Sequence, residues 1–138
     1  MSGMTFSSTE KVSFLSDCIL ISQDLLSDIL FSINQLNNFV PQNEYYINRS
    51  LINLTNDISK FVELTSLLTK LLQTSIKQTV PEIKESHLQL LFILKGINQA
   101  RINQDFIALE ELIKYELKDN LTQWKIDLIP QVKRLLAP

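Results

Sequence analysis

The chain contains few residues that could catalyse a reaction or bind a metal. It has one histidine, His87, and one cysteine, Cys18, on different predicted helices. Di-iron helical bundles use Glu-x-x-His pairs from two helices, and zinc sites use several Cys and His ligands. Glu85 lies two residues before His87 rather than three. We therefore predict that the protein binds no metal and no cofactor, and that His87 is a partly exposed helical residue.

Nucleophilic catalysis finds no better support in the sequence. Cys18 lies among apolar residues of the first predicted helix, where burial raises the pKa of a thiol and leaves it unreactive. The densest acidic group, formed by Glu110, Glu111 and Glu116, is typical of a solvated helix face. The two glycines of the chain provide no glycine-rich loop for a phosphate. We expect the protein not to be an enzyme.

One carboxylate lies on the predicted core side of a helix. A projection of residues 104–129 at about 100° per residue places Glu110 within the apolar arc of that helix. A carboxylate that faces a core needs a partner or stays protonated. Arg101 and Lys114 are near enough in sequence to pair with it. The pattern indicates a structural ion pair or exposure at the edge of the arc, or else a ligand pocket around Glu110 and Arg101.

The composition excludes several classes of protein. With 13 basic and 15 acidic residues, the net charge is −2, which disfavours an electrostatically driven nucleic-acid binder. Leucine and isoleucine supply 40 of the 138 residues, whereas glycine supplies two and proline four. A many-stranded barrel or sandwich needs more turn residues than this. The length suits one domain with a substantial core.

The apolar residues recur every three or four positions, which predicts helices. The pattern breaks near Pro41, near Pro81 and again over residues 96–104, and proline disfavours helical geometry in the residue before it. We predict helices at about 8–38, 43–78, 82–100 and 104–129, with Pro130 ending or kinking the last. Short connections favour antiparallel neighbours. The predicted fold is therefore all-α, a single up-down-up-down antiparallel four-helix bundle over residues 1–138.

The first predicted helix is apolar over more of its surface than a bundle requires. Its apolar arc spans about 180°, against roughly 100° for an ordinary surface helix. Leu20 and Phe31 lie outside even this arc, while Ile21 and Phe39 lie at its edge. Large exposed apolar patches often mark interaction sites. We predict that Leu20, Ile21, Phe31 and Phe39 line a dimer or partner interface.

The sequence carries no recognisable targeting or membrane signal. Its first residues lack a basic region followed by an unbroken apolar run, so we expect no signal peptide. No window offers about 20 uncharged apolar residues, so we expect no membrane insertion. Cys18 alone forms no internal disulfide. These features predict a cytoplasmic location.

The segment ARINQDFIALEELIKYELKDNLTQW, residues 100–124, resembles part of a group of small uncharacterised bacterial helical-bundle proteins. The matching positions are an aspartate, an Ala-Leu-x-x-Leu-x-x-Tyr-Glu-Leu run and a tryptophan, namely Asp105, Ala108, Leu109, Leu112, Tyr115, Glu116, Leu117 and Trp124. The overall layout is similar to that of flagellin-type flagellar export chaperones, which are small acidic helical bundles that bind an unfolded partner segment. Neither resemblance implies an enzymatic activity.

We interpret the sequence as a non-enzymatic interaction module, an adaptor or chaperone-like bundle in a bacterial flagellar or secretion assembly pathway. Its expected partner is another polypeptide or a second copy of the chain. The alternative is a helical bundle with a small-molecule pocket, sensory or enzymatic, around Glu110 and Arg101. The first hypothesis predicts an exposed apolar groove or a dimer. The second predicts a closed cavity that contains Glu110.

Overall fold

The computed structural model describes residues 8–36, 38–77 and 80–137, and every regular element in these ranges is helical. The predicted all-α class is therefore confirmed. Three long helices come first in the chain, and they are α1 (Ser8–Asn34), α2 (Glu44–Leu71) and α3 (Pro81–Ile102). A fourth helical rod follows, built from α4 (Phe106–Glu111), η3 (Leu112–Leu117), α5 (Lys118–Gln123), η4 (Trp124–Leu128) and α6 (Ile129–Leu136).

The first connection begins earlier than the sequence predicts. α1 ends at Asn34 rather than near residue 38, and a 3-10 turn, η1 (Pro41–Asn43), precedes α2. Phe39 lies in this connection and is only 5% exposed. If α1 continued to residue 38, the chain would still follow the axis of α1 at that point. Because α1 ends at Asn34, the chain turns earlier and the Phe39 ring lies in the core.

The other two connections use turn geometry that short loops require. α2 continues as a π-helical turn, η2 (Leu72–Ile76), and ends at Lys77, whose φ of 55° is left-handed. Pro81 occupies the first turn of α3, where its missing N–H costs no hydrogen bond. Asp105 caps α4 by accepting a hydrogen bond from the Ala108 amide at 3.1 Å. These boundaries lie within a few residues of the predicted ones.

Pro130 does not end the last helix, which continues to Leu136. A proline inside a helix lacks an amide donor, and its ring clashes with the carbonyl four residues earlier. The π-helical turn η4 lies directly before it, and the Ile129 amide donates to the carbonyl oxygen of Trp124, five residues back. This wider turn shifts the hydrogen-bond register just ahead of the proline, which accommodates the ring without breaking the rod.

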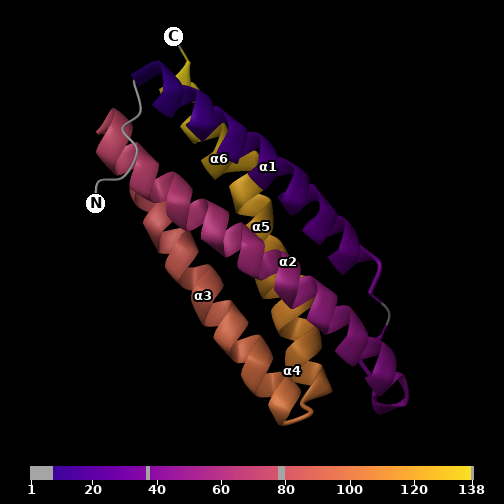
Figure 1. Ribbon diagram of the computed structural model, residues 1–138. Coiled ribbons are helices and arrows are strands. Elements are labelled where there is room, and N and C mark those ends of the chain that lie inside the picture. Colours follow the sequence, from indigo (N-terminus) through magenta and orange to yellow (C-terminus); the bar gives the residue numbers. More distant parts are fainter. Residues whose placement is uncertain (1–7, 37, 78–79, 138) are drawn as a thin grey trace, which may run out of the picture.

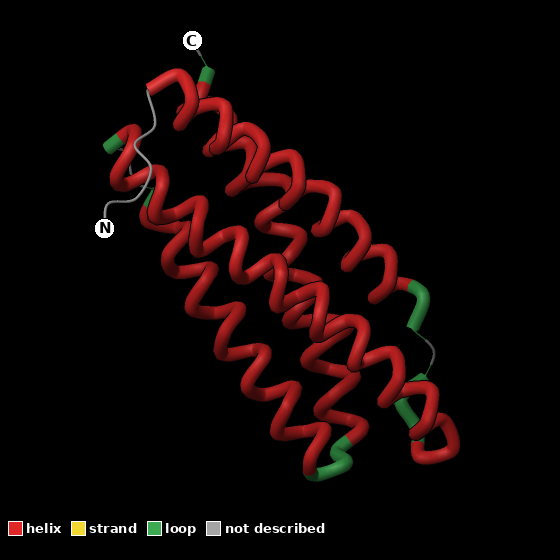
Figure 2. The backbone as a smooth tube through the Cα atoms, viewed as in Figure 1, coloured by secondary structure: helices red, strands yellow, loops and turns green. Residues whose placement is uncertain are grey.

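The helical rods lie side by side along one long axis (Figures 1 and 2), with short loops at their ends. α1 packs against α2 and against α5 and α6, while α3 packs against α2, α4, η3 and α5. Each rod therefore has two neighbours in a ring. In the view of Figure 1 the α4–α6 rod lies behind α2. This arrangement leaves an outer seam between each pair of neighbouring rods.

A single apolar core runs through the rods, and aromatic rings fill its centre. Trp124 and Phe61 are both fully buried, with ring centroids 5.5 Å apart and ring planes at 88°. The sequence predicts Trp124 on the core side with a wet indole edge; the burial is confirmed, but the wet edge is wrong because the indole is 0% exposed. The smaller core residues include Leu15, Ile29, Leu51, Ile58, Leu90, Ile97, Ile113, Leu117 and Leu128.

One polar side chain crosses the core between α3 and α5. Asn120 is 2% exposed, and its Nδ2 donates to the Ser86 carbonyl at 3.1 Å and to Gln89 Oε1 at 2.9 Å. Its Oδ1 atom and the Trp124 Nε1 atom are buried without a hydrogen-bond partner. Unpaired buried polar atoms cost stability, whereas paired ones specify alignment. The Asn120 amide therefore joins α5 to α3 through hydrogen bonds inside the core.

We predict that Leu54→Ala and Ile113→Ala each lower the free energy of unfolding by about 2–5 kcal/mol, because each removes buried methyl groups and leaves a cavity. Leu54 is 3% exposed and Ile113 is 0% exposed. Chemical denaturation followed by circular dichroism measures the change. Leu88→Ala is the matched control, since Leu88 is 57% exposed and should lose much less. Losses below about 1 kcal/mol at both buried sites would contradict this assignment of the core.

Candidate functional site

The structure separates the four residues predicted to line a partner interface. Leu20, Ile21 and Phe31 are exposed, at 58%, 54% and 65%. Phe39 is buried, and the Nζ atom of Lys114 lies 5.5 Å from the centre of its ring. The prediction that Phe39 lies on a contact surface is therefore corrected, because the connection after α1 folds its ring into the core. The interface role of the other three residues stays a prediction.

The three exposed residues do not form one patch. Leu20 faces a hollow of about 290 Å³ that α1 shares with Lys133 and Leu136 of α6. Ile21 and Phe31 line hollows that α1 shares with α2, although Phe31, about three turns after Leu20, lies on nearly the same face of α1 as Leu20. The part of α1 that faces α2 therefore carries two of the three predicted contact residues.

A groove runs along the outer seam between α1 and α2, and we call it the α1–α2 groove. Its first part is a hollow of about 550 Å³ lined by apolar and charged side chains, namely Ile21, Asp24, Leu25, Asp28, Lys60, Glu63, Leu64 and Leu67. Its second part is a hollow of about 260 Å³ lined by Phe31, Ser32, Gln35, Leu36, Tyr46, Ser50, Asn53, Leu54 and Asp57.

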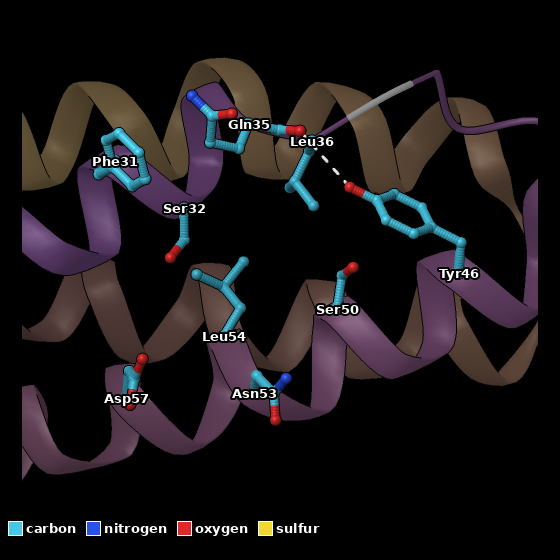
Figure 3. A pocket seen from close by; sticks show the side chains of 9 residues that line it. All are labelled: Phe31, Ser32, Gln35, Leu36, Tyr46, Ser50, Asn53, Leu54 and Asp57. Atoms are coloured by element: carbon cyan, nitrogen blue, oxygen red, sulfur yellow. Dashed lines mark hydrogen bonds between the residues drawn. The ribbon is translucent and has the colours of Figure 1, made fainter.

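The second part of the groove mixes apolar and hydrogen-bonding groups. Figure 3 shows Leu36 and Leu54 pointing toward each other across the space between the two helices. The Tyr46 hydroxyl donates to the Gln35 carbonyl oxygen at 3.4 Å and closes one end. Ser50 points into the same space (Figure 3). This end of the groove has an apolar centre with hydroxyl and amide groups around it.

Glu110 and Arg101 do not form the pocket that the alternative hypothesis predicts. Glu110 pairs with Lys114, with an Oε1 to Nζ distance of 3.2 Å, and its side chain is 38% exposed. The hollow beside Glu110 is open to solvent and lined by Ile107, Glu111, Tyr115 and Glu116 rather than by Arg101. A single-turn ion pair at the surface satisfies the carboxylate. This geometry favours the ion-pair interpretation over a ligand pocket.

His87 joins α3 to α2 through two hydroxyl groups. Its Nδ1 lies 3.1 Å from Thr65 Oγ1, and its Nε2 lies 3.3 Å from Ser66 Oγ. Thr65 Oγ1 already donates to the Val62 carbonyl, so it accepts from Nδ1–H and leaves Nε2 to accept from Ser66. The interior amides of α2 are engaged in helical hydrogen bonds, so Ser66 has no oxyanion-stabilising pair beside it. This cluster holds two helices together; His87 is half-buried, as predicted.

Cys18 is placed where the sequence predicts it. The side chain is 3% exposed on the core side of α1, and burial raises the pKa of its thiol, with a further contribution from the neighbouring Asp17 carboxylate. A thiol with a raised pKa stays protonated and is a poor nucleophile. Within the described residues, no group of three His, Cys, Asp or Glu side chains is arranged to hold a metal ion.

Sequence reasoning missed the polar clusters and the groove. Thr65 and Asn120 lie on the apolar stripes of their helices, and a polar residue in such a stripe is the signal that could have identified them. The α1–α2 groove has no such signal. It depends on which two helix faces meet, and Asp57 and Lys60 join Asp28 only after α1 and α2 have packed.

Comparison of the chain with models of protein families, with curated proteins and with solved structures finds no match. The resemblances to bacterial helical-bundle proteins and to flagellar export chaperones therefore stay predictions. None of the helices in the described ranges combines the length and the apolar character needed to cross a bilayer.

We predict that the protein loses stability as the pH falls through 6.5, because burial lowers the pKa of His87 below this ordinary value. The unfolded chain then takes up a proton at a higher pH than the folded chain does, and acidification favours unfolding. Urea denaturation at several pH values measures this. His87→Gln keeps hydrogen-bonding groups for Thr65 and Ser66 and should flatten the dependence; a variant as pH-dependent as the wild type would contradict it.

Proposed function

We propose that this protein is a non-enzymatic interaction module, an adaptor or chaperone-like helical bundle that binds another polypeptide. The observation that carries the proposal is the exposure of large apolar side chains along α1 at Leu20, Ile21 and Phe31. Isolated exposed apolar residues are ordinary. Here each of the three borders a hollow, and two of these hollows form the α1–α2 groove. Apolar side chains at the edge of a groove are typical of a binding surface.

An up-down-up-down antiparallel four-helix bundle is the topology we propose for this module. Three observations support it: the connections are short, each rod packs against two neighbours, and the colours of Figure 1 run in alternating directions along the long axis. Such a bundle needs one stripe of each helix for its core. The apolar residues on the remaining faces are then available for a partner.

The proposed setting is the cytoplasm of a bacterium, in a flagellar or secretion assembly pathway. This part of the proposal rests on the resemblances of residues 100–124 and of the overall layout. Genome neighbourhood tests it, because genes for flagellar or secretion components beside this one would support an assembly role. A neighbourhood of unrelated metabolic genes would count against that pathway.

We predict that the double substitution Leu20→Asp, Phe31→Asp abolishes self-association or partner capture and leaves helicity unchanged. Helicity is retained because both side chains are exposed, so neither new carboxylate is buried in the core. Light scattering and affinity capture measure binding, and circular dichroism measures helicity.

The matched control is Leu88→Asp, Phe92→Asp on α3. It changes the same residue types, and these side chains are 57% and 77% exposed. The control should bind as the wild type does. Loss of helicity in the α1 variant would place Leu20 and Phe31 in the core. A folded α1 variant that associates or captures its partner normally would move the interface away from α1.

A further inference from the structure

The two parts of the α1–α2 groove lie end to end along the seam between α1 and α2, and together we call them the channel. Asp28 lines the first part and Ser32 the second, and these residues lie one turn apart on α1. Lys60 and Asp57 stand in the same relation on α2. Residues three or four positions apart share a helix face, so both parts open on the same side of the molecule. From Ile21 to Gln35, the first residue after α1, the channel is about 21 Å long, which is about four helical turns.

The floor of the channel is apolar and its walls are acidic. Leu25 and Leu64 are half-buried at the seam, and Ile21 and Leu67 are exposed beside them. The charged residues that line the two parts are Asp24, Asp28, Asp57, Glu63 and Lys60, which is four acidic side chains against one basic. An apolar strip of this length with a charged border has the form that receives an amphipathic helix.

The charge of the walls selects among occupants. A second copy that used the same groove would bring two acidic channels together, and like charges placed face to face oppose association. The acidic headgroups of an anionic bilayer would be repelled in the same way. A helix whose apolar stripe is flanked by lysine or arginine would place its cations against the carboxylates of Asp24, Asp28 and Asp57.

We propose that the α1–α2 groove binds a basic amphipathic helix of a partner protein, with Leu or Ile side chains on the floor and Lys or Arg side chains along the acidic walls. This inference rests on the proposed interaction function and specifies the chemistry of the partner. It places the determinant of partner choice in Asp24 and Asp28, which lie on the exposed rim of α1.

The test uses two synthetic helical peptides of about 15 residues, the length that matches the groove. Both carry leucines at helical spacing, and they differ only in having lysine or glutamate beside the leucine stripe. Fluorescence anisotropy with the full chain measures their affinities. We expect the lysine peptide to bind about ten-fold more tightly than the glutamate peptide, and this preference to shrink as salt is raised.

Charge reversal on α1 tests the site itself. In Asp24→Lys, Asp28→Lys the preference should invert, with the glutamate peptide binding more tightly, which a merely unfolded variant would not produce. The matched control is Glu85→Lys, Asp119→Lys, which makes the same change of charge at exposed positions of α3 and α5. The control should keep the preference for the lysine peptide.

Several results would overturn the inference. Equal affinities for the two peptides would contradict selection by charge. If neither peptide binds, the groove does not capture an amphipathic helix. A preference that survives in Asp24→Lys, Asp28→Lys would place the site elsewhere. If the chain binds neither peptide and the charge reversal strengthens a dimer, then the occupant of the groove is a second copy of the chain. The proposed function fails separately, through unchanged association in Leu20→Asp, Phe31→Asp.

Discussion

The edge-to-face contact between Phe61 and Trp124 lies where α2 and the last helical rod meet inside the core. These two rings are the largest fully buried side chains, and the core around them is mostly leucine and isoleucine. Close packing of so large a pair sets how far apart the rods can lie at this level. The smaller residues above and below must fit that spacing.

Buried polar side chains form hydrogen bonds that oppose sliding of neighbouring helices along each other. The hydrophobic effect between leucine and isoleucine side chains has no preferred direction. A core made of these residues alone therefore tolerates sliding of one helix along another. Asn120 couples α5 to α3 through Ser86, and His87 couples α3 to α2 through Thr65. A shift of one helix along another would separate the partners of these hydrogen bonds. The alignment matters outside the core too, because it decides which charged and apolar residues of neighbouring helices stand opposite each other on the surface.

The α1–α2 groove depends on the packing of α1 against α2. Asp24 and Asp28 belong to an acidic face that is visible from α1 alone, whereas Lys60 and Leu64 come from α2. The apolar surplus of α1 was predicted as a contact surface, and the structure divides it. Phe39 is buried in the core and Leu20 borders the hollow shared with α6. Ile21 and Phe31 border the groove. Glu110, the other residue singled out by its helical position, is satisfied locally by Lys114.

Helical periodicity and the backbone limits of proline are local properties, so the helical class, the stripes that become core and the approximate helix ends follow from the order of the residues. For this reason the predicted burial of Cys18 is confirmed. The π-helical turn directly before Pro130 accommodates that proline locally. Packing between the helices, by contrast, turns Phe39 inward. It also decided which faces of α1 and α2 form a groove. These features depend on packing between segments distant in the chain, and no local pattern encodes that geometry.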